Sequence, residues 1–181
     1  WRFGVLLSGS GRTLTNLLAV IGRGELDAEI VAVVSSVEGV RGLDVARDAG
    51  IPAQVVSRRD APDVMAYSQR VYDAFAPFDV DLVIMAGFLR RVLVFPGWEG
   101  RILNIHPALL PDAAAYAAGR GRYGERVHEA VIAHGDVVSG ATVHVVTDVY
   151  DDGPPLLRAE VPVLPGDTPE TLGTRVFMAE C

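Results

Sequence analysis

An asparagine, a histidine and a group of aspartates have the residue types and spacing that acyl-group chemistry requires. Asn104 and His106 are separated by one residue, Ile105, at the end of an apolar run, so in a strand both side chains point to the same side. An amide N–H beside an imidazole can stabilise a negatively charged tetrahedral oxygen and supply a proton. One turn contains Asp148, Asp151 and Asp152, any of which could raise the pKa of His106 and keep it cationic.

A glycine-rich segment over residues 8–13 could bind a phosphate group. It follows a short apolar run and opens an amphipathic stretch, which predicts a helix N-terminus whose N–H groups and dipole attract anions. A dinucleotide-binding loop does not fit, because Leu14 stands where the third glycine is needed and the second expected strand ends in Val34-Ser35-Ser36, without an acidic residue for a ribose. We expect the backbone of Gly11, Arg12 and Thr13 to bind a phosphomonoester; the alternative is a tight turn without a ligand.

The composition excludes several classes of protein. The chain has no lysine, so a Schiff-base lysine, pyridoxal-phosphate catalysis and a Walker phosphate loop are excluded. The formal charge of −7 and the scattered arginines argue against a nucleic-acid partner. No apolar run is long enough to cross a membrane. The single cysteine, Cys181, cannot form an internal disulfide, which favours the reducing cytoplasm.

The other histidines fit catalytic motifs less well. His128 and Glu129 begin a zinc-enzyme signature, but Ile132 stands where the second histidine is needed, so we expect no metal ion. We expect His128 and His134 on a helix, at the surface or behind the site. We expect His144 to lie within an alternating strand and face the core or the site, and we favour a structural role for it. The chain has no G-x-S-x-G motif for a serine nucleophile.

Short Val, Ile and Leu runs alternate with amphipathic stretches, a pattern typical of a parallel sheet covered by helices. We expect an α/β fold: a Rossmann-like, doubly wound, mostly parallel sheet with helices on both faces, in a single domain over residues 1–181. Alternating residues after Asp136 predict an antiparallel edge strand near the C-terminus. The expected strands are Phe3–Leu7, Glu29–Ser35, Ala53–Val56, Leu82–Met85, Arg101–Ile105, Val138–Val146 and Pro155–Val161, and the expected helices are Thr13–Ile21, Val40–Ala49, Val64–Phe75, Arg122–His134 and a last one capped by Asp167 or Thr168.

Three polar segments follow expected strands: residues 8–13, residues 87–91 and residues 104–106. Ligands of doubly wound sheets bind at the carboxyl ends of the strands. We therefore expect these segments at one edge of the sheet.

The run Asn104-Ile105-His106-Pro107-Ala108-Leu109-Leu110-Pro111 resembles the signature of the phosphoribosylglycinamide formyltransferase family, folate-dependent enzymes of purine synthesis. The resemblance extends along nearly the whole chain. It also includes Leu7-Ser8-Gly9-Ser10-Gly11, Met85-Ala86-Gly87-Phe88-Leu89-Arg90, Ser139-Gly140-Ala141-Thr142-Val143-His144 and Asp151-Asp152-Gly153-Pro154.

This resemblance implies direct transfer of the formyl group of 10-formyltetrahydrofolate to the amine of phosphoribosylglycinamide. It implies that Asn104 and His106 stabilise the oxyanion, that His106 protonates the leaving N10, and that Asp151 raises the pKa of His106 and moves the amine proton. It further implies small-molecule substrates and no metal, and leaves a homodimer open. The other implied roles are phosphate binding by Gly11, Arg12 and Thr13, substrate binding by Glu180, and folate binding by Leu89, Arg90, Arg91, Val92, Asn104 and Val146.

The chain also departs from the family pattern. Residues 112–118 replace an aromatic residue and a glycine that usually follow the proline, and Val64 replaces an arginine that meets the folate tail, with Arg58 and Arg59 nearby. The chain ends at Cys181, before the usual end of the family. The alternatives are another folate-dependent formyltransferase or a formyltetrahydrofolate hydrolase, and a non-catalytic phosphate- or folate-binding protein.

Overall fold

The computed structural model describes residues 1–119 and 121–181, and the chain divides into two compact units, Trp1–Ile102 and Leu103–Cys181. In the first unit the strands lie in the order β3-β2-β1-β4 and are all parallel. Both faces of β1 are buried, which explains its continuous apolar sequence. The strands are β1 (Arg2–Leu7), β2 (Glu29–Ser35), β3 (Ala53–Val55) and β4 (Leu82–Met85).

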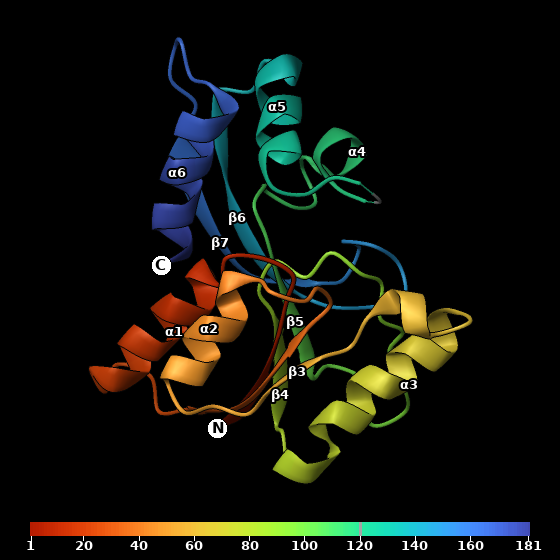
Figure 1. The fold of residues 1–181 in the computed structure, drawn as a ribbon. Coiled ribbons are helices and arrows are strands. Elements are labelled where there is room, and N and C mark those ends of the chain that lie inside the picture. Colours follow the sequence, from red (N-terminus) through yellow and green to blue (C-terminus); the bar gives the residue numbers. More distant parts are fainter. Residues whose placement is uncertain (120) are drawn as a thin grey trace. The chain divides into compact units, whose positions relative to one another are not determined.

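Helices cover both sides of these parallel strands. In Figure 1, α1 and α2 lie together on one side and α3 lies on the other. The Asp63 side chain caps α3 by accepting a 2.8 Å hydrogen bond from the Ala66 N–H. The helices are α1 (Arg12–Gly22), α2 (Arg41–Asp48) and α3 (Val64–Phe75), with 3₁₀ turns η1 (Arg58–Asp60) and η2 (Ala76–Phe78). The expected doubly wound arrangement is confirmed.

The second unit contains antiparallel strands and a helical layer. Its strands, in the order β5-β6-β7, are β5 (Ile102–His106), β6 (Val138–Val145) and β7 (Pro155–Pro162), so the expected antiparallel strands are confirmed. The helices α5 (Glu125–His134) and α6 (Pro169–Glu180) pack on each other, and α6 contacts both β6 and β7. Thr168 caps α6 in a reciprocal hydrogen-bonded pair with Thr171, as one of the two expected caps.

Two features differ from the expected elements. The segment that departs from the family pattern contains a short helix, α4 (Ala114–Ala117), which was not expected. Helix α5 begins at Glu125 rather than Arg122, because Gly121 and Gly124 have positive φ angles of 85° and 55° that a helix cannot accommodate.

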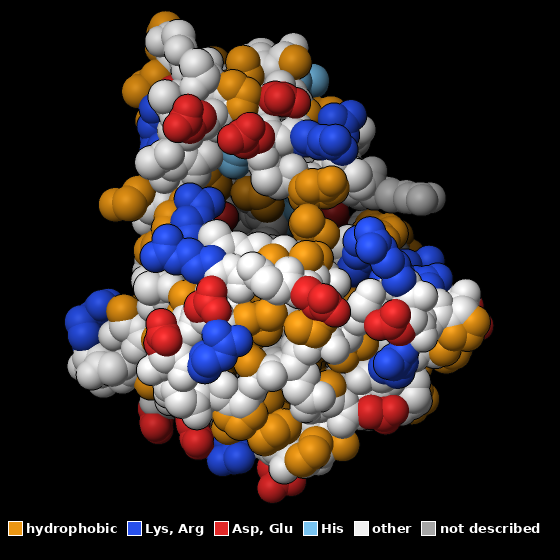
Figure 2. Space-filling model, viewed as in Figure 1, with side chains coloured by type: hydrophobic (Ala, Val, Ile, Leu, Met, Phe, Trp, Pro, Cys, Tyr) orange, Lys and Arg blue, Asp and Glu red, His pale blue; other side chains and the backbone are white. Residues whose placement is uncertain are grey.

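On the face drawn in Figure 2, arginine and carboxylate side chains are intermixed, and the described residues form no continuous basic patch there. Among residues 1–119 and 121–181, no helix has the length and apolar character needed to cross a membrane.

Candidate active site

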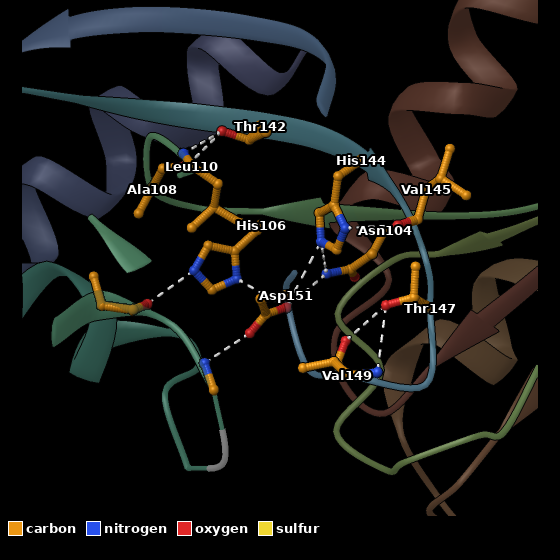
Figure 3. Close-up of polar contacts among 12 residues, drawn as sticks. Asn104, His106, Ala108, Leu110, Thr142, His144, Val145, Thr147, Val149 and Asp151 are labelled. Atoms are coloured by element: carbon orange, nitrogen blue, oxygen red, sulfur yellow. Dashed lines mark hydrogen bonds and ion pairs between the residues drawn. The ribbon is translucent and has the colours of Figure 1, made fainter. Parts of the chain in front are cut away.

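The polar side chains of β5 and β6 form one face in the second unit. The strand register pairs Asn104 with His144 and His106 with Thr142. Because side chains alternate along a strand, these four residues share a face, as Figure 3 shows. The expectation that Asn104 and His106 point to the same side is confirmed.

His106 lies between two hydrogen-bond acceptors. Its Nδ1 is 3.6 Å from Asp151 Oδ1, and its Nε2 is 2.8 Å from the carbonyl oxygen of Ala117 (Figure 3). The imidazole is 4% exposed. Since a carbonyl oxygen can only accept, Nε2 carries a hydrogen, and Nδ1 is the nitrogen that can gain or lose a proton.

Asp151 lies in the turn between β6 and β7, with a positive φ of 53°. Its Oδ2 accepts a 2.8 Å hydrogen bond from the Gly119 N–H, and its Oδ1 is 3.4 Å from Asn104 Nδ2. A Cβ added at Gly153 would lie 1.7 Å from the Val145 carbonyl oxygen, so only glycine fits two residues after this aspartate. The glycine of the Asp-x-Gly pattern therefore allows the close turn that brings Asp151 to His106.

His144 belongs to the same cluster, although the sequence favoured a structural role over one in the site. Its Nε2 is 3.0 Å from Asn104 Nδ2 and its Nδ1 is 3.1 Å from the Val145 carbonyl oxygen. Because an amide nitrogen only donates, His144 Nε2 accepts, and the hydrogen of the neutral ring is on Nδ1. The alternation of residues 138–146 could have identified this contact once the pairing of β5 with β6 was known.

Burial controls the charge of the catalytic candidates. Burial lowers the pKa of His106 below its ordinary value of 6.5, although Asp151 and the Ala117 carbonyl oxygen act in the opposite direction. The net shift of the His106 pKa is therefore opposite to the expected one, because desolvation outweighs the carboxylate. Burial also opposes ionisation of Asp151, but contacts with His144, His106 and the Gly119 N–H together lower its pKa.

Thr142 fixes the chain that follows His106. Its hydroxyl donates a 2.7 Å hydrogen bond to the Ala108 carbonyl oxygen and accepts a 2.9 Å hydrogen bond from the Leu110 N–H. All three groups are buried, so both bonds form in a protected environment. The sequence offered no sign of this role beyond the position of Thr142 within a family motif.

The predicted phosphate segment lies in the first unit and opens α1 as expected. Gly11 has a positive φ of 73° and a Cβ added there would lie 2.6 Å from the Cα of Gly42. Arg12 begins the helix and is exposed, while Thr13 is half-buried. Glycine at position 11 is thus required both by the backbone angle and by the packing of α2 against the loop.

The predicted folate residues belong to both units. Leu89, Arg90 and Arg91 follow β4 in the first unit and are exposed, whereas Val92 is buried. In the second unit, Val146 follows β6 and the half-buried Glu180 ends α6. Thus the structure places Asn104, His106 and Asp151 together within the second unit. Within the first unit it places residues 8–13 beside residues 87–91, joined by a 3.1 Å bond from the Ser8 N–H to the Gly87 carbonyl oxygen.

The remaining histidines lie outside this cluster. His128 is 5% exposed, because it faces α6 where Gly173 leaves room for its ring; of the two expected positions, the surface one is therefore wrong. His134 is exposed, stacks on Tyr116 with ring centroids 3.9 Å apart and contacts Asp136 at 2.7 Å. Across residues 1–119 and 121–181, no group of three or more His, Cys, Asp or Glu side chains is arranged to hold a metal ion.

Comparison with known proteins identifies relatives over the whole chain. The family model described as "Formyl transferase" matches residues 1–181. A trifunctional purine biosynthetic protein adenosine-3 from Bos taurus is 38% identical over 99% of the chain, which spans only 17% of that protein. A chloroplastic phosphoribosylglycinamide formyltransferase from Arabidopsis thaliana is 36% identical, with 99% of the chain and 61% of the relative covered. The crystal structure of glycinamide ribonucleotide transformylase 1 from Symbiobacterium toebii has a TM-score of 0.88 and 38% identity, covering 99% of the chain and 81% of the other.

Proposed function

Because the chain belongs to the formyl transferase family, we propose that it transfers the formyl group of 10-formyltetrahydrofolate to the amine of phosphoribosylglycinamide in de novo purine synthesis. The observation that carries this proposal is the cluster that Asn104, His106 and His144, on one face of β5 and β6, form with Asp151 from the turn after β6. It supplies an amide donor, a titratable imidazole and an ionised carboxylate, the groups required for acyl transfer through a tetrahedral intermediate.

Asn104 acts in this proposal on the oxygen of the formyl group. When the amine nitrogen bonds to the formyl carbon, that oxygen becomes negative, and donors already in position lower the barrier. One hydrogen of Asn104 Nδ2 is held by His144 Nε2 at 3.0 Å. The other has only a long 3.4 Å contact with Asp151 Oδ1, and it turns to the oxyanion in this proposal. His144 is thus a positioning residue for the amide.

His106 and Asp151 move the proton. The attacking amine loses one proton and the leaving N10 gains one, so the reaction is balanced without an external acid. The Ala117 carbonyl oxygen holds the hydrogen on His106 Nε2, which leaves Nδ1 to receive the proton of the amine and pass it to N10. Asp151, 3.6 Å from Nδ1, stabilises the transient imidazolium.

The substrate-binding roles rest on the family pattern together with the local geometry. We assign the phosphate to the backbone of Gly11, Arg12 and Thr13 at the N-terminus of α1, where the helix dipole favours an anion. The further assignments are Glu180 to the ribonucleotide, and Leu89, Arg90, Arg91, Val92, Asn104 and Val146 to the folate.

We propose Arg58 or Arg59 as the substitute for the arginine that Val64 replaces. Both lie in η1, shortly before α3, and a guanidinium group suits the carboxylates of a folate tail.

We also assign the whole of residues 1–181 to one domain, since a single family model spans it. The lone exposed Cys181 supports a cytoplasmic location, although the Arabidopsis thaliana relative is named chloroplastic. The proposed partners are small molecules; a homodimer can be tested by sedimentation.

A spectrophotometric assay with a 10-formyltetrahydrofolate analogue and phosphoribosylglycinamide tests the function. His106→Ala and Asp151→Asn should each lower kcat by about 10² to 10⁴. The matched controls are His134→Ala and Asp152→Asn, which change an exposed histidine and the exposed neighbouring aspartate, and should stay within about twofold. Equal rates in the catalytic variants and the controls would remove the mechanism.

A non-catalytic binding protein is the second candidate, favoured by one observation: protein acceptors face both ring nitrogens of His106. Binding of both ligands without turnover would establish it. Release of formate without the ribonucleotide would instead identify a hydrolase.

A further inference from the structure

A single serine connects the ends of the parallel strands in the first unit. Ser8 directly follows β1, and its hydroxyl is 2.6 Å from the Ser36 hydroxyl, which directly follows β2. The same Ser8 oxygen accepts a 2.9 Å hydrogen bond from the Leu89 N–H, in the segment after β4. One side chain therefore links three neighbouring strand ends at the carboxyl edge of the sheet.

Ser8 also holds the turn after β4 at both of its ends. Its backbone N–H donates to the Gly87 carbonyl oxygen at 3.1 Å, and its side chain accepts from the Leu89 N–H two residues later. Gly87 has a positive φ of 72° and the chain bends at this residue. The direction in which residues 89–92 leave the sheet is thus set by Ser8.

The Ser8 hydroxyl is buried, so loss of its hydrogen bonds should be costly. Ser8 is 8% exposed and Ser36 is 5% exposed. Removing the Ser8 oxygen would leave the Leu89 N–H and the Ser36 hydroxyl without this shared partner, and buried polar groups left unpaired are costly.

We propose that Ser8 is a positioning residue for folate binding, which acts by fixing the backbone of residues 89–92 through the Leu89 N–H. The inference rests on the proposed function, since it takes residues 89–92 as part of the folate site. Ser8 also begins the segment that contains Gly11, Arg12 and Thr13, so it holds the folate segment to the start of the phosphate segment.

Ser8→Ala tests the inference against the matched control Ser35→Ala. Ser35 is also buried, but its hydroxyl bonds to the N–H and carbonyl oxygen of Val37 within its own turn. Hydrogen–deuterium exchange at the Leu89 amide, followed by NMR, measures the hydrogen bond from the Leu89 N–H to the Ser8 hydroxyl directly, without any substrate. Steady-state kinetics and calorimetric titration with the folate analogue measure its consequence.

We expect Ser8→Ala to speed exchange at the Leu89 amide about tenfold and to raise KM and Kd for the folate analogue about tenfold, with kcat within about threefold. Ser35→Ala should change none of these by more than about twofold. Unchanged Leu89 exchange, or a fall in kcat with folate KM unchanged, would overturn the inference.

Ser36→Ala keeps the test decisive if Ser8→Ala does not fold. It removes only the partner of the Ser8 hydroxyl, so an increase of about two- to threefold in Leu89 exchange and in folate Kd is expected; no increase overturns the inference. If the wild type itself does not bind the folate analogue, the proposed function fails, while the exchange measurement still reports on the hydrogen bond between Ser8 and Leu89.

Discussion

Gly11 is the residue of the phosphate segment whose replacement should have the largest effect. In Gly11→Ala the new Cβ would lie 2.6 Å from the Cα of Gly42. This Cα belongs to the backbone of α2, so the contact cannot be relieved by rotation of a flexible side chain. The backbone angle adds a second penalty, because φ is 73° and alanine rarely adopts the left-handed region. Gly9→Ala is the matched control, since a Cβ there meets no atom within 4 Å.

The magnitude follows from these two terms. The left-handed conformation costs about 1–2 kcal/mol for a residue with a side chain. The close contact with Gly42 adds a further loss of stability of about 1 kcal/mol or more, because α2 or the loop must shift by several tenths of an ångström to relieve it. The free energy of unfolding should fall by about 2–3 kcal/mol, which lowers Tm by about 4–12 °C for a chain of this length.

The shift also has a kinetic consequence. Displacing Gly11 moves the N–H groups of the first turn of α1 away from the proposed phosphate position, so KM for the ribonucleotide should rise at least about tenfold while KM for folate stays within about twofold. Urea unfolding and steady-state kinetics on Gly11→Ala and Gly9→Ala measure both effects. Equal unfolding midpoints for the two variants, or equal increases in the two KM values, would refute this reasoning.

Three further predictions concern the second unit. Gly153→Ala should lower kcat at least about tenfold in the formyl-transfer assay, because its Cβ would lie 1.7 Å from the Val145 carbonyl oxygen and displace the catalytic turn. Thr142→Val should lower the urea-derived free energy of unfolding by about 1–3 kcal/mol, since the Leu110 N–H loses its buried acceptor; an unchanged midpoint would contradict this. The lowered pKa of His106 means that the unfolded chain binds a proton more readily, so stability should fall as pH drops below about 6.5, and His106→Gln should reduce that loss between pH 7.5 and 5.5 in urea titrations.

The sequence predicted the regular elements well where pattern and end signals agree. The helix over Val64–Phe75 has the predicted bounds, because apolar periodicity and the Asp63 cap both mark its start. Helix α4 was missed because an alanine-rich stretch of four residues has neither amphipathic periodicity nor a capping side chain. The start of α5 was placed three residues early because helical patterning does not report the backbone angle of Gly124.

The site was predictable in its side chains and not in its backbone contacts. Asn104 and His106 followed from strand alternation, and Asp151 followed from the family resemblance. The carbonyl oxygen of Ala117 carries no residue-specific signal, since every residue has one, and only the three-dimensional path of residues 112–119 brings it to His106. His144 was assigned a structural role because its position opposite Asn104 depends on the register of β5 and β6.

The charge of His106 shows why a residue pattern alone could not determine its role in the proposed mechanism. A carboxylate near an imidazole predicts a cation, and Asp151 does act in that direction, but at 3.6 Å it is outweighed by the loss of hydration around a ring that is 4% exposed. A neutral imidazole with its hydrogen on Nε2 is a base at Nδ1, so it must receive a proton before it can give one. The attacking amine is the proton source that the reaction itself provides, and Asp151 and the Ala117 carbonyl oxygen both favour the cation once it forms. Burial and these two acceptors therefore suit His106 to accept the proton in one step and release it to N10 in the next.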